Sequence, residues 1–441
     1  MGRENQGGGG EPESARVARG EGSPTSGEAP LRVMFLGTYD LSKPRNRILI
    51  RGLREAGAEL IECHEPVWEA VADKSTLRPH ELGAHLWRAA LSYARLGRRL
   101  LGADKPDVVW IGYMGQLDVL VLGSLARLRA IPVVWDVFIS LYDTVVDDRA
   151  LVPKGGALAR LLYAWEWLGC RTASLVLMDT RAHAEYLAST YGLAPERVDF
   201  VWVGVEPDEF PAAGLAPTSA EQGPLEVLFY GQFIALHGID TIVGAARLLE
   251  GEPIHFSMIG TGQEEARIRS LLSERPLSNV TWEPWVRYEE LIGRIRRADV
   301  CLGIFGTSGK AGRVIPNKVF QVVSAQRPLV TRDSEAIREL FRGDEAGVWL
   351  VPPGDPAALA ARLRALAAGR AELPHAPHAA LAASIAPRAI GQQAISRIRR
   401  AVGGARRGGS RARRRGSRIS RTTGRLRTAR SGPGCRRPCR C

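Results

Sequence analysis

Short apolar runs that alternate with helical stretches constrain the fold of this chain more than any other feature. One set of runs lies between residues 31 and 203, and a second set lies between 226 and 351. Strands that alternate with helices predict a parallel sheet covered on both faces. The two sets therefore predict two doubly wound α/β domains, at 31–205 and 225–379, with the Pro-rich residues 206–224 as the linker. The predicted strands are 31–37, 59–63, 107–112, 132–136, 174–178, 198–203, 226–230, 254–260, 280–283, 300–304, 328–331 and 348–351.

The two ends of the 441-residue chain differ in composition from its middle. Residues 1–30, rich in Gly, Glu, Ser and Pro, predict a disordered lead. A closing helix is predicted at 380–401, and the Gly, Ser and Arg of 402–441 predict a disordered tail. The formal net charge is +13, but the stretch from Arg397 onward holds 17 Arg and no acid, so residues 1–396 carry −4.

A mildly acidic body argues against nucleic acid as a partner of the folded part. The Arg-rich tail allows three interpretations: a nucleic-acid arm, a membrane-surface tether, or a sequence without a selected role, such as a frame error would produce.

The cysteines of the body argue for a reducing compartment. Cys63, Cys170 and Cys301 are far apart, and no pair among them has the Cys-x-x-Cys spacing of a zinc site. Intracellular proteins keep such thiols reduced. Residues 1–30 lack the apolar core of a secretory signal, and no stretch reaches the roughly 20 apolar residues of a membrane span. We therefore expect a cytoplasmic protein.

The segment with the most chemical content is 303–321, GIFGTSGKAGRVIPNKVFQ. It leaves a predicted strand, crosses a glycine-rich loop and enters a helix at Pro316. Glycines let backbone N–H groups approach an anion, and a helix N-terminus adds partial positive charge. With the cations Lys310, Arg313 and Lys318, this pattern predicts a site for a diphosphate. The alternative is a glycine-rich turn with solvated cations.

A second loop, 229–240 (FYGQFIALHGID), also joins a predicted strand to a helix through glycines. We predict that His237 within it faces the site and hydrogen-bonds a phosphate oxygen. The alternative for a lone His is a hydrogen bond to the local backbone.

Acidic residues follow one strand of the first domain. Asp136 ends the strand predicted at 132–136, and ligands of open α/β sheets bind beyond the carboxyl ends of strands. We predict that Asp136 orients a ligand hydroxyl or acts as its base, with a loop or helix cap as the alternative. Asp143, Asp147 and Asp148 form a cluster that we interpret as a solvated face rather than a metal site.

Three segments together resemble the retaining glycosyltransferases of the GT-B fold known as family four, over most of residues 31–400. Residues 229–240 are similar to that family's Gly-Arg…Lys-Gly-x-Asp loop. Residues 316–330 (PNKVFQVVSAQRPLV) resemble its Pro-x-Lys-x-x-Glu-x-x-Ala-x-Gly-x-Pro-Val stretch, and 201–210 (VWVGVEPDEF) resemble its Asn-Gly-Val-Asp…Phe run. The resemblance implies two Rossmann-like domains, a cleft between them and a nucleotide-sugar donor on the second.

The same resemblance shows where this chain departs from the family. The family's phosphate-contacting Arg and Lys fall on Gln232 and His237, and its two glutamates fall on Arg313 and Gln321. In the family the first glutamate holds the donor sugar and the second holds the ribose. Gln321 can still hydrogen-bond ribose hydroxyls, but Arg313 cannot copy a carboxylate. Lys318, with Lys310, is predicted to replace the missing cations.

These inferences give one set of candidate residues and one reaction. The resemblance implies transfer with retention, in which cations and backbone N–H groups stabilise the departing diphosphate and neither a cofactor nor a metal is needed. Two alternatives are a nucleotide-sugar epimerase of the same fold and a non-catalytic protein that binds sugar nucleotides or nucleic acid. Catalytic roles are predicted for Asp136, His237, Lys310 and Lys318, and donor contacts for Gly231, Gln232, Gly306, Thr307, Ser308, Gly309, Arg313, Asn317 and Gln321.

The predicted partners are a nucleotide-sugar donor and a glycan, lipid-linked or small-molecule acceptor. Residues 81–101 predict a helix with an apolar stripe and with several arginines, Arg88 and Arg98 among them, off that stripe. A basic amphipathic helix can touch an anionic membrane, which would place the protein at the inner membrane face. The alternative is an ordinary surface helix packed on the core.

Overall fold

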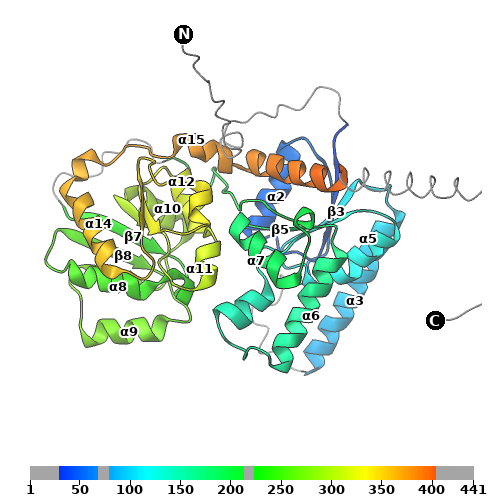
Figure 1. Cartoon of the computed structure of the whole chain (residues 1–441), viewed down its shortest axis with the longest axis horizontal. Coiled ribbons are helices and arrows are strands. Elements are labelled where there is room, and N and C mark those ends of the chain that lie inside the picture. Colours follow the sequence, from blue (N-terminus) through cyan, green and yellow to red (C-terminus); the bar gives the residue numbers. More distant parts are fainter. Residues whose placement is uncertain (1–28, 68–78, 213–222, 404–441) are drawn as a thin grey trace, which may run out of the picture. The chain divides into compact units, whose positions relative to one another are not determined.

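Two six-stranded sheets organise the protein, one in each half of the chain (Figure 1). The computed structural model describes residues 29–67, 79–212 and 223–403. The first sheet has the order β2-β1-β3-β4-β5-β6 and the second β12-β11-β10-β7-β8-β9, and all neighbouring strands are parallel. The predicted pair of doubly wound α/β sheets is confirmed. The strands are β1 (Arg32–Gly37), β2 (Glu59–His64), β3 (Val108–Ile111), β4 (Val133–Asp136), β5 (Leu175–Met178), β6 (Val198–Phe200), β7 (Leu225–Tyr230), β8 (Ile254–Ile259), β9 (Val280–Glu283), β10 (Val300–Leu302), β11 (Leu329–Arg332) and β12 (Val348–Val351).

The helices of the first half cover both faces of its sheet. The chain steps from β1 to β2 through α2 (Pro44–Glu55), and the later connections step across the sheet in the opposite direction. Because parallel crossovers are right-handed, these later helices lie on the face opposite α2. They are α3 (Pro79–Gly102), α4 (Gln116–Asp118), the π-helix η1 (Val119–Gly123), α5 (Ser124–Leu128), the π-helix η2 (Asp143–Asp148), α6 (Ala157–Thr172), α7 (Arg181–Tyr191) and the 3-10 helix η3 (Pro195–Arg197).

The second half contains one short helix that the sequence analysis did not predict. The segment after β10 was expected to cross a loop to Pro316, but α11 (Gly309–Arg313) forms within it. The hydroxyl of Ser308 caps α11 by accepting a hydrogen bond from the N–H of Ala311 at 3.2 Å. The other helices are η4 (Ala235–His237), α8 (Ile239–Leu248), α9 (Glu265–Glu274), α10 (Tyr288–Arg297), α12 (Asn317–Ser324), α13 (Ile337–Leu340), α14 (Pro356–Ala368) and η5 (Arg370–Glu372).

The closing helix predicted at 380–401 is interrupted. The short helices α15 (Ala379–Ala382) and η6 (Ala383–Ile385) come first, and a longer helix begins at 387. Ala386 between them is extended, with φ −69° and ψ 156°, because Pro387 disfavours helical geometry in the residue before it. The longer helix packs on α2, where a Cβ on Gly391 would lie 1.9 Å from the carbonyl oxygen of Gly52.

Contacts group the described residues as far as Ile398 into one compact unit. The predicted lead at 1–30, the middle of the predicted linker and nearly all of the predicted tail at 402–441 lie outside the described residues.

The burial of the strands explains why the sequence predicted them correctly. Strands covered by helices on both faces are apolar throughout, and β3, β4 and β5 are buried at every residue. The thiols of Cys63, Cys170 and Cys301 are free and buried, and burial raises the pKa of Cys301 to about 12. Among the described residues, the structure has no helix that combines the length and the apolar character needed to span a membrane.

Candidate functional site

Lys318 is a buried lysine in the first turn of α12. It is 5% exposed, its Nζ lies 3.8 Å from the ring centre of Phe229, and among the described residues this Nζ has no hydrogen-bond partner. Burial holds the pKa of Lys318 well below its usual value. A buried ammonium group without a hydrogen-bonded anion is costly. An anionic group placed beside Nζ would offset this cost.

Gly231 and His237 border the same point. Gly231 has a φ of 138°, and a Cβ there would lie 3.0 Å from Nζ of Lys318 and 3.2 Å from Cε1 of His237. The Nδ1 of His237 hydrogen-bonds the carbonyl oxygen of Gln232, whose side chain is exposed. Burial, together with the charge of Lys318, holds the pKa of His237 well below its usual value. His237 thus bonds the local backbone and also borders the cation.

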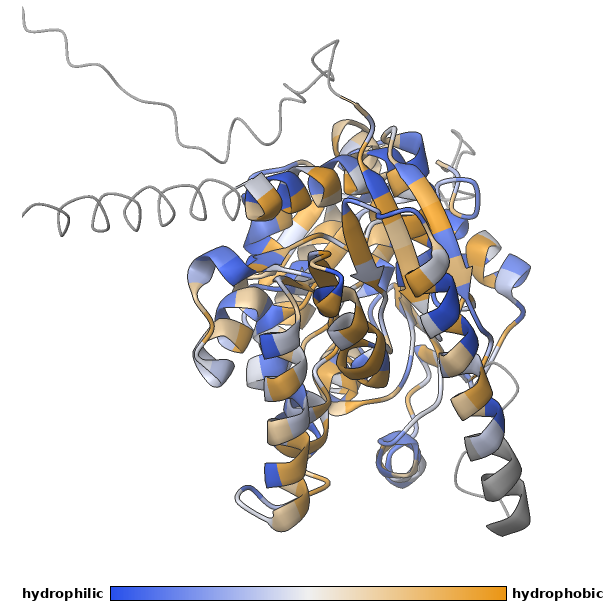
Figure 2. Ribbon diagram, turned by 90° about the vertical axis from the view of Figure 1, so that its right-hand side faces the viewer, coloured by the Kyte–Doolittle hydropathy of each residue, from blue (hydrophilic) through white to orange (hydrophobic). Residues whose placement is uncertain are grey.

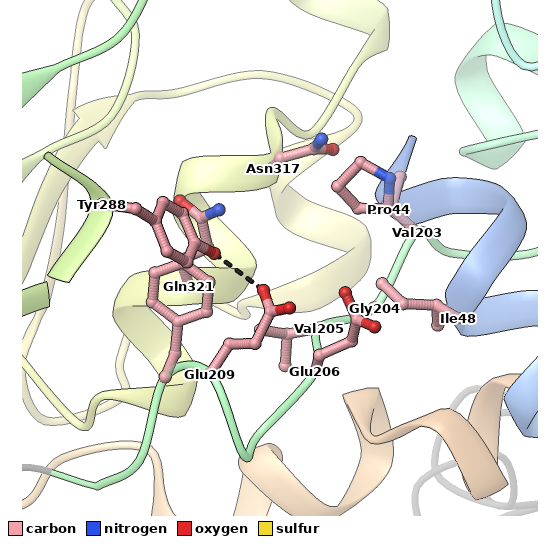
Figure 3. Close-up of a pocket in the computed structure, with 11 residues that line it drawn as sticks. Pro44, Ile48, Val203, Gly204, Val205, Glu206, Glu209, Tyr288, Asn317 and Gln321 are labelled. Carbon is pink, nitrogen blue, oxygen red and sulfur yellow. Dashed lines mark hydrogen bonds between the residues drawn. The ribbon is translucent and has the colours of Figure 1, made fainter. Parts of the chain in front are cut away.

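A small pocket with a cavity volume of about 20 Å³ lies beside α12 (Figure 3). Two predicted donor residues, Asn317 and Gln321, line it from α12. The Oε1 of Gln321 accepts a hydrogen bond from the hydroxyl of Tyr230 at 3.0 Å, and the hydroxyl of Tyr288 donates to Glu209 at 2.8 Å. The remaining lining residues are Pro44, Ile48, Val203, Gly204, Val205, Glu206 and Phe210. One helix therefore carries Lys318 and also one wall of a partly apolar pocket.

Two other residues predicted for the donor site, Lys310 and Arg313, contact the first half of the chain. Nη2 of Arg313 donates to Oδ1 of Asp143 at 2.7 Å, and Nζ of Lys310 donates to the hydroxyl of Thr144 at 2.5 Å. The same Nζ lies 3.3 Å from Oδ2 of Asp143. The roles of Lys310 and Arg313 toward a donor stay predictions, because in the structure both side chains pair with the one carboxylate of Asp143.

The acidic cluster of the first half forms the other side of this contact. Asp143 is 0% exposed, so its interpretation as part of a solvated face is wrong. Asp147 pairs with Lys154 at 2.8 Å, and Asp148 accepts a hydrogen bond from the hydroxyl of Ser308 at 2.9 Å. The π-helix η2 carries all three carboxylates, and the cations of α11 allow the burial of Asp143.

His183 completes the group around Asp143. Its Nδ1 lies 2.7 Å from Oδ1 of Asp179, and its Nε2 lies 3.5 Å from Oδ2 of Asp143. Thr180 caps α7 by accepting a hydrogen bond from the N–H of His183. Burial lowers the pKa of His183, but Asp179 and Asp143 outweigh burial and hold it above its usual value. We call this set the Asp143 cluster: Asp143, Asp179, His183, Lys310 and Arg313.

The loop glycines differ in their surroundings. A Cβ on Gly306 would lie 2.4 Å from the carbonyl oxygens of Ala235 and Leu236, so Gly306 is needed where two loops pack together. Thr307 and Gly309 are exposed, and their contact with a donor stays a prediction. In the part of the chain that the structure describes, no three His, Cys, Asp or Glu side chains are grouped so that they could hold a metal ion.

Asp136 is in an ion pair, which corrects its interpretation as a cap. It is 0% exposed, and its two carboxylate oxygens accept from Nη2 and Nε of Arg45 at 2.8 and 2.9 Å. Nη1 of Arg45 also donates to the carbonyl oxygens of Val201 and Trp202. Because Arg45 occupies both oxygens, the geometry favours a structural role for Asp136 over the predicted contact with an acceptor.

Family models match both halves of the chain. Residues 42–204 match the model described as glycosyl transferase 4-like domain, and residues 224–368 match the model described as glycosyl transferases group 1. The chain belongs to the group 1 glycosyltransferases. The resemblance drawn from its motifs is thereby confirmed.

This glycosyltransferase is similar over part of its length to several bacterial relatives. The amylovoran biosynthesis glycosyltransferase AmsK of Erwinia amylovora is 27% identical over 186 residues, which is 41% of this chain and 45% of AmsK. The putative colanic acid biosynthesis glycosyltransferase WcaL of Salmonella typhimurium (strain LT2) is 29% identical over 177 residues, 39% of this chain and 42% of WcaL. The matched segments thus span less than half of each relative.

Solved structures share the fold over a larger part of the chain. HepE of Anabaena in complex with UDP superposes with a TM-score of 0.59 at 14% identity, over 83% of this chain and 99% of HepE. Sucrose-phosphate synthase of Thermosynechococcus elongatus superposes with a TM-score of 0.54 at 17% identity, over 88% of this chain and 100% of the synthase. At these identities the likeness shows the GT-B fold alone.

Sequence patterns did not identify the partners of the site residues in this glycosyltransferase. They missed Asp143 as the partner of Arg313, and they missed Tyr288 and Glu209 of the pocket. One signal was available in the sequence. Arg313 stands where the family has a glutamate, and a buried cation needs an anion nearby. Residues 143–148 contain three carboxylates that could supply it.

Replacing Asp143 by Asn in the glycosyltransferase should lower the free energy of unfolding by about 2–3 kcal/mol at neutral pH. Burial alone raises the pKa of Asp143, but His183, Lys310 and Arg313 together hold it at about 2. A depressed carboxylate pKa stabilises the fold above the unfolded value near 3.9, and this contribution is lost as the pH falls toward about 2. Urea unfolding between about pH 2 and pH 7 measures the difference.

The matched control for this prediction is Asp148→Asn, which removes a carboxylate from the same π-helix with one hydroxyl partner, Ser308. We expect a loss below about 1 kcal/mol for the control. Equal stability of the Asp143→Asn protein and the wild type at neutral pH would contradict the prediction.

Proposed function

We propose that this chain transfers a sugar from a nucleoside diphosphate donor to an acceptor hydroxyl. The observation that carries the proposal is the buried Nζ of Lys318, which lies beside Gly231 and has no hydrogen-bond partner in the part of the chain that the structure describes. It sits in the first turn of α12, whose N-cap residue Pro316 makes no side-chain cap. The first N–H groups of that helix therefore have no side-chain acceptor at this end, and they attract negative charge. A diphosphate satisfies both the ammonium group and the helix terminus.

We propose that the nucleoside part of the same donor binds at the edge of the pocket beside α12. Gln321 lines it one turn after Lys318, and its side chain can hydrogen-bond ribose hydroxyls. HepE was solved with UDP and also with UDP-glucose, which supports a uridine nucleotide as the first donor to test. The exposed side chains of Gln232 and Thr307, and the backbone of Gly309, are proposed to add polar contacts to the donor.

The chemistry follows from where these charges lie. The bond between the anomeric carbon and the diphosphate oxygen breaks, and the acceptor oxygen bonds to the same face of that carbon. Lys318 and the N–H groups of α12 stabilise the charge that grows on the diphosphate. The anion raises the pKa of His237, so that His237 gains a proton and donates to a phosphate oxygen.

We propose retention of the anomeric configuration. In such a transfer the departing phosphate takes the proton of the acceptor hydroxyl, so no side-chain base is required. The pairing of Asp136 with Arg45 supports this route, because it withdraws the one carboxylate predicted as a base. Protein cations neutralise the diphosphate, and we therefore propose that transfer proceeds without a divalent metal.

The acceptor is proposed to be a growing glycan or a lipid-linked glycan. Two relatives are named for the biosynthesis of amylovoran and of colanic acid. We propose that this chain likewise builds a cell-surface polysaccharide, from the cytoplasmic side.

The test is calorimetric binding of UDP, followed by turnover with UDP-sugars. We expect UDP to bind, UDP-sugar to be cleaved slowly in water and faster with a glycan acceptor, and EDTA to change neither rate. Proton NMR of the first product should show the anomeric configuration of the donor. Failure to bind any nucleoside diphosphate sugar would refute the proposal. A product with the opposite anomeric configuration would refute retention alone. A donor sugar epimerised at a ring carbon in the absence of acceptor would favour an epimerase.

A further inference from the structure

Three helical segments on one face of the first sheet expose many large apolar side chains. These are α3, the continuous α4-η1-α5 segment and α6, and η1 contacts both of the others. Leu128 is 84% exposed, Trp87 is 67% exposed and Leu161 is 58% exposed. Soluble monomers rarely carry a large continuous apolar patch without a partner for it.

The outer side of α6 carries the most regular part of this surface. Leu158, Leu161, Trp165 and Leu168 are all exposed, and their spacing of three, four and three residues places them on one stripe. The opposite side of α6 packs inward, where Ala159, Glu166 and Cys170 are at most 1% exposed. Figure 2 faces this side of the molecule and shows hydrophobic colouring along its helices. The helix therefore cannot turn this stripe inward.

The charges on the same helices have one sign. Every exposed charged side chain that the structure describes on these three segments is an arginine, from Arg88 to Arg171. Their two acids with described side chains, Asp118 and Glu166, are each 1% exposed. Arg95 lies 2.7 Å from Glu65, so part of this charge is compensated at one edge. A basic face on a body with a net charge of −4 is a local feature of these helices.

We propose that this surface, the α3–α6 face, binds an anionic lipid bilayer. Leu and Trp side chains enter the boundary between headgroups and acyl chains, and arginines contact lipid phosphates. A second copy of the chain fits less well, because a symmetric contact would set these arginines against the same arginines. The apolar stripe predicted on the helix at 81–101 is not part of this face. Leu96 and Leu100 of that stripe are buried in the core, whereas Trp87 of the same helix is exposed.

The test must separate this face from the Arg-rich tail, which also attracts anionic lipid. The full chain is mixed with vesicles of equal parts phosphatidylglycerol and phosphatidylcholine in about 0.5 M salt, where contacts by charge alone are screened. The variant carries Leu158→Ser, Leu161→Ser, Trp165→Ser and Leu168→Ser. The matched control carries Leu248→Ser and Trp285→Ser, whose side chains are 52% and 74% exposed in the second half.

We expect the wild type and the control to co-sediment with these vesicles and the α6 variant to partition about ten-fold more weakly. Brominated acyl chains should quench tryptophan fluorescence in the wild type, and residues 402–441 contain no Trp that could account for it. Equal partitioning of the variant and the wild type, without quenching, would overturn the proposal in favour of the tail. A wild-type dimer that the α6 variant dissociates would overturn it in favour of a second copy.

This inference does not depend on the proposed function, because vesicle binding needs no donor. The urea unfolding transition of the α6 variant, measured in the same preparation, should stay cooperative as in the wild type, which shows that the variant is folded without reference to donor binding. If the glycosyl acceptor is lipid-linked, the α3–α6 face brings the enzyme to the surface that holds it.

Discussion

Replacing Lys318 by Met should weaken UDP binding by roughly ten- to one-hundred-fold and raise the free energy of unfolding by about 1–3 kcal/mol. The two effects share one cause. Within the described ranges, the Nζ of Lys318 is buried and has no hydrogen-bond partner, so its desolvation lowers the stability of the fold. An anionic ligand would compensate for this cost. Met fills a similar volume without a charge. Calorimetry with UDP and urea unfolding measure the two changes.

The protonation of Lys318 gives this prediction a second readout. Burial holds its pKa well below the usual value, so the unfolded chain binds a proton that the folded chain binds less tightly. Wild-type stability should therefore rise with pH toward the unfolded value of about 10.4, and the Lys318→Met protein should lack that rise. A bound diphosphate restores the proton. This proton comes from the buffer, so the enthalpy of UDP binding should depend on the ionisation enthalpy of the buffer. The dependence should be weaker for the Lys318→Met protein, which has no amine at this position.

The control for Lys318→Met is Lys154→Met. The side chain of Lys154 is 72% exposed and pairs with Asp147, so the change should leave UDP affinity unaltered and stability within about 0.5 kcal/mol. Wild-type UDP affinity in a folded Lys318→Met protein would remove Lys318 from the donor site. A loss of stability in that protein would mean that the ammonium group has a stabilising partner in the fold.

The two sheets, and the position of Lys318 at the start of a helix, were predictable because their signals are local in sequence. A strand buried on both faces is a short apolar run whatever lies next to it, as in β3 and β5. A glycine with a φ of 138° at the end of β7, and a lysine in the first turn after a proline, are also features of neighbouring residues. The loop and the helix that border the proposed donor site could therefore be identified before their contact was known.

The partners of charged residues were not predictable because they depend on tertiary packing. Arg313 and Asp143 lie 170 residues apart and meet only where α11 reaches η2. A π-helix has no local sequence rule comparable to that of an α-helix, so the direction of Asp143 could not be inferred from its spacing to Asp147. The break at Pro387, by contrast, has a local signal, because a proline disfavours helical geometry in the residue before it. The helix predicted at 380–401 did not take this signal into account.

Replacing Asp136 by Ala should lower the free energy of unfolding by about 3–5 kcal/mol, the largest loss of stability that we expect from a single change in this chain. The guanidinium of Arg45 is 1% exposed and gives two of its hydrogen bonds to Asp136. Without the carboxylate, a buried cation keeps the carbonyl oxygens of Val201 and Trp202 as partners but has no anion. Thermal and urea unfolding both measure the loss.

A double variant separates the ion pair from simple loss of volume. Arg45→Met with Asp136→Leu removes both charges and fills the space with apolar atoms, so we expect it to be more stable than Asp136→Ala alone. It should still be less stable than the wild type, because the carbonyl oxygens of Val201 and Trp202 lose their donor, at about 1–3 kcal/mol.

The isosteric change Asp136→Asn decides between the structural role and the role of an acceptor base. The amide keeps the shape of the carboxylate but offers Arg45 one acceptor oxygen and no charge, so a structural Asp136 predicts a stability loss. UDP affinity should stay near the wild-type value in the folded fraction, because the proposed donor site lies around Lys318. A protein with native stability and UDP affinity that no longer transfers sugar would instead return Asp136 to the reaction, and Arg45 would then have to release it when the acceptor binds.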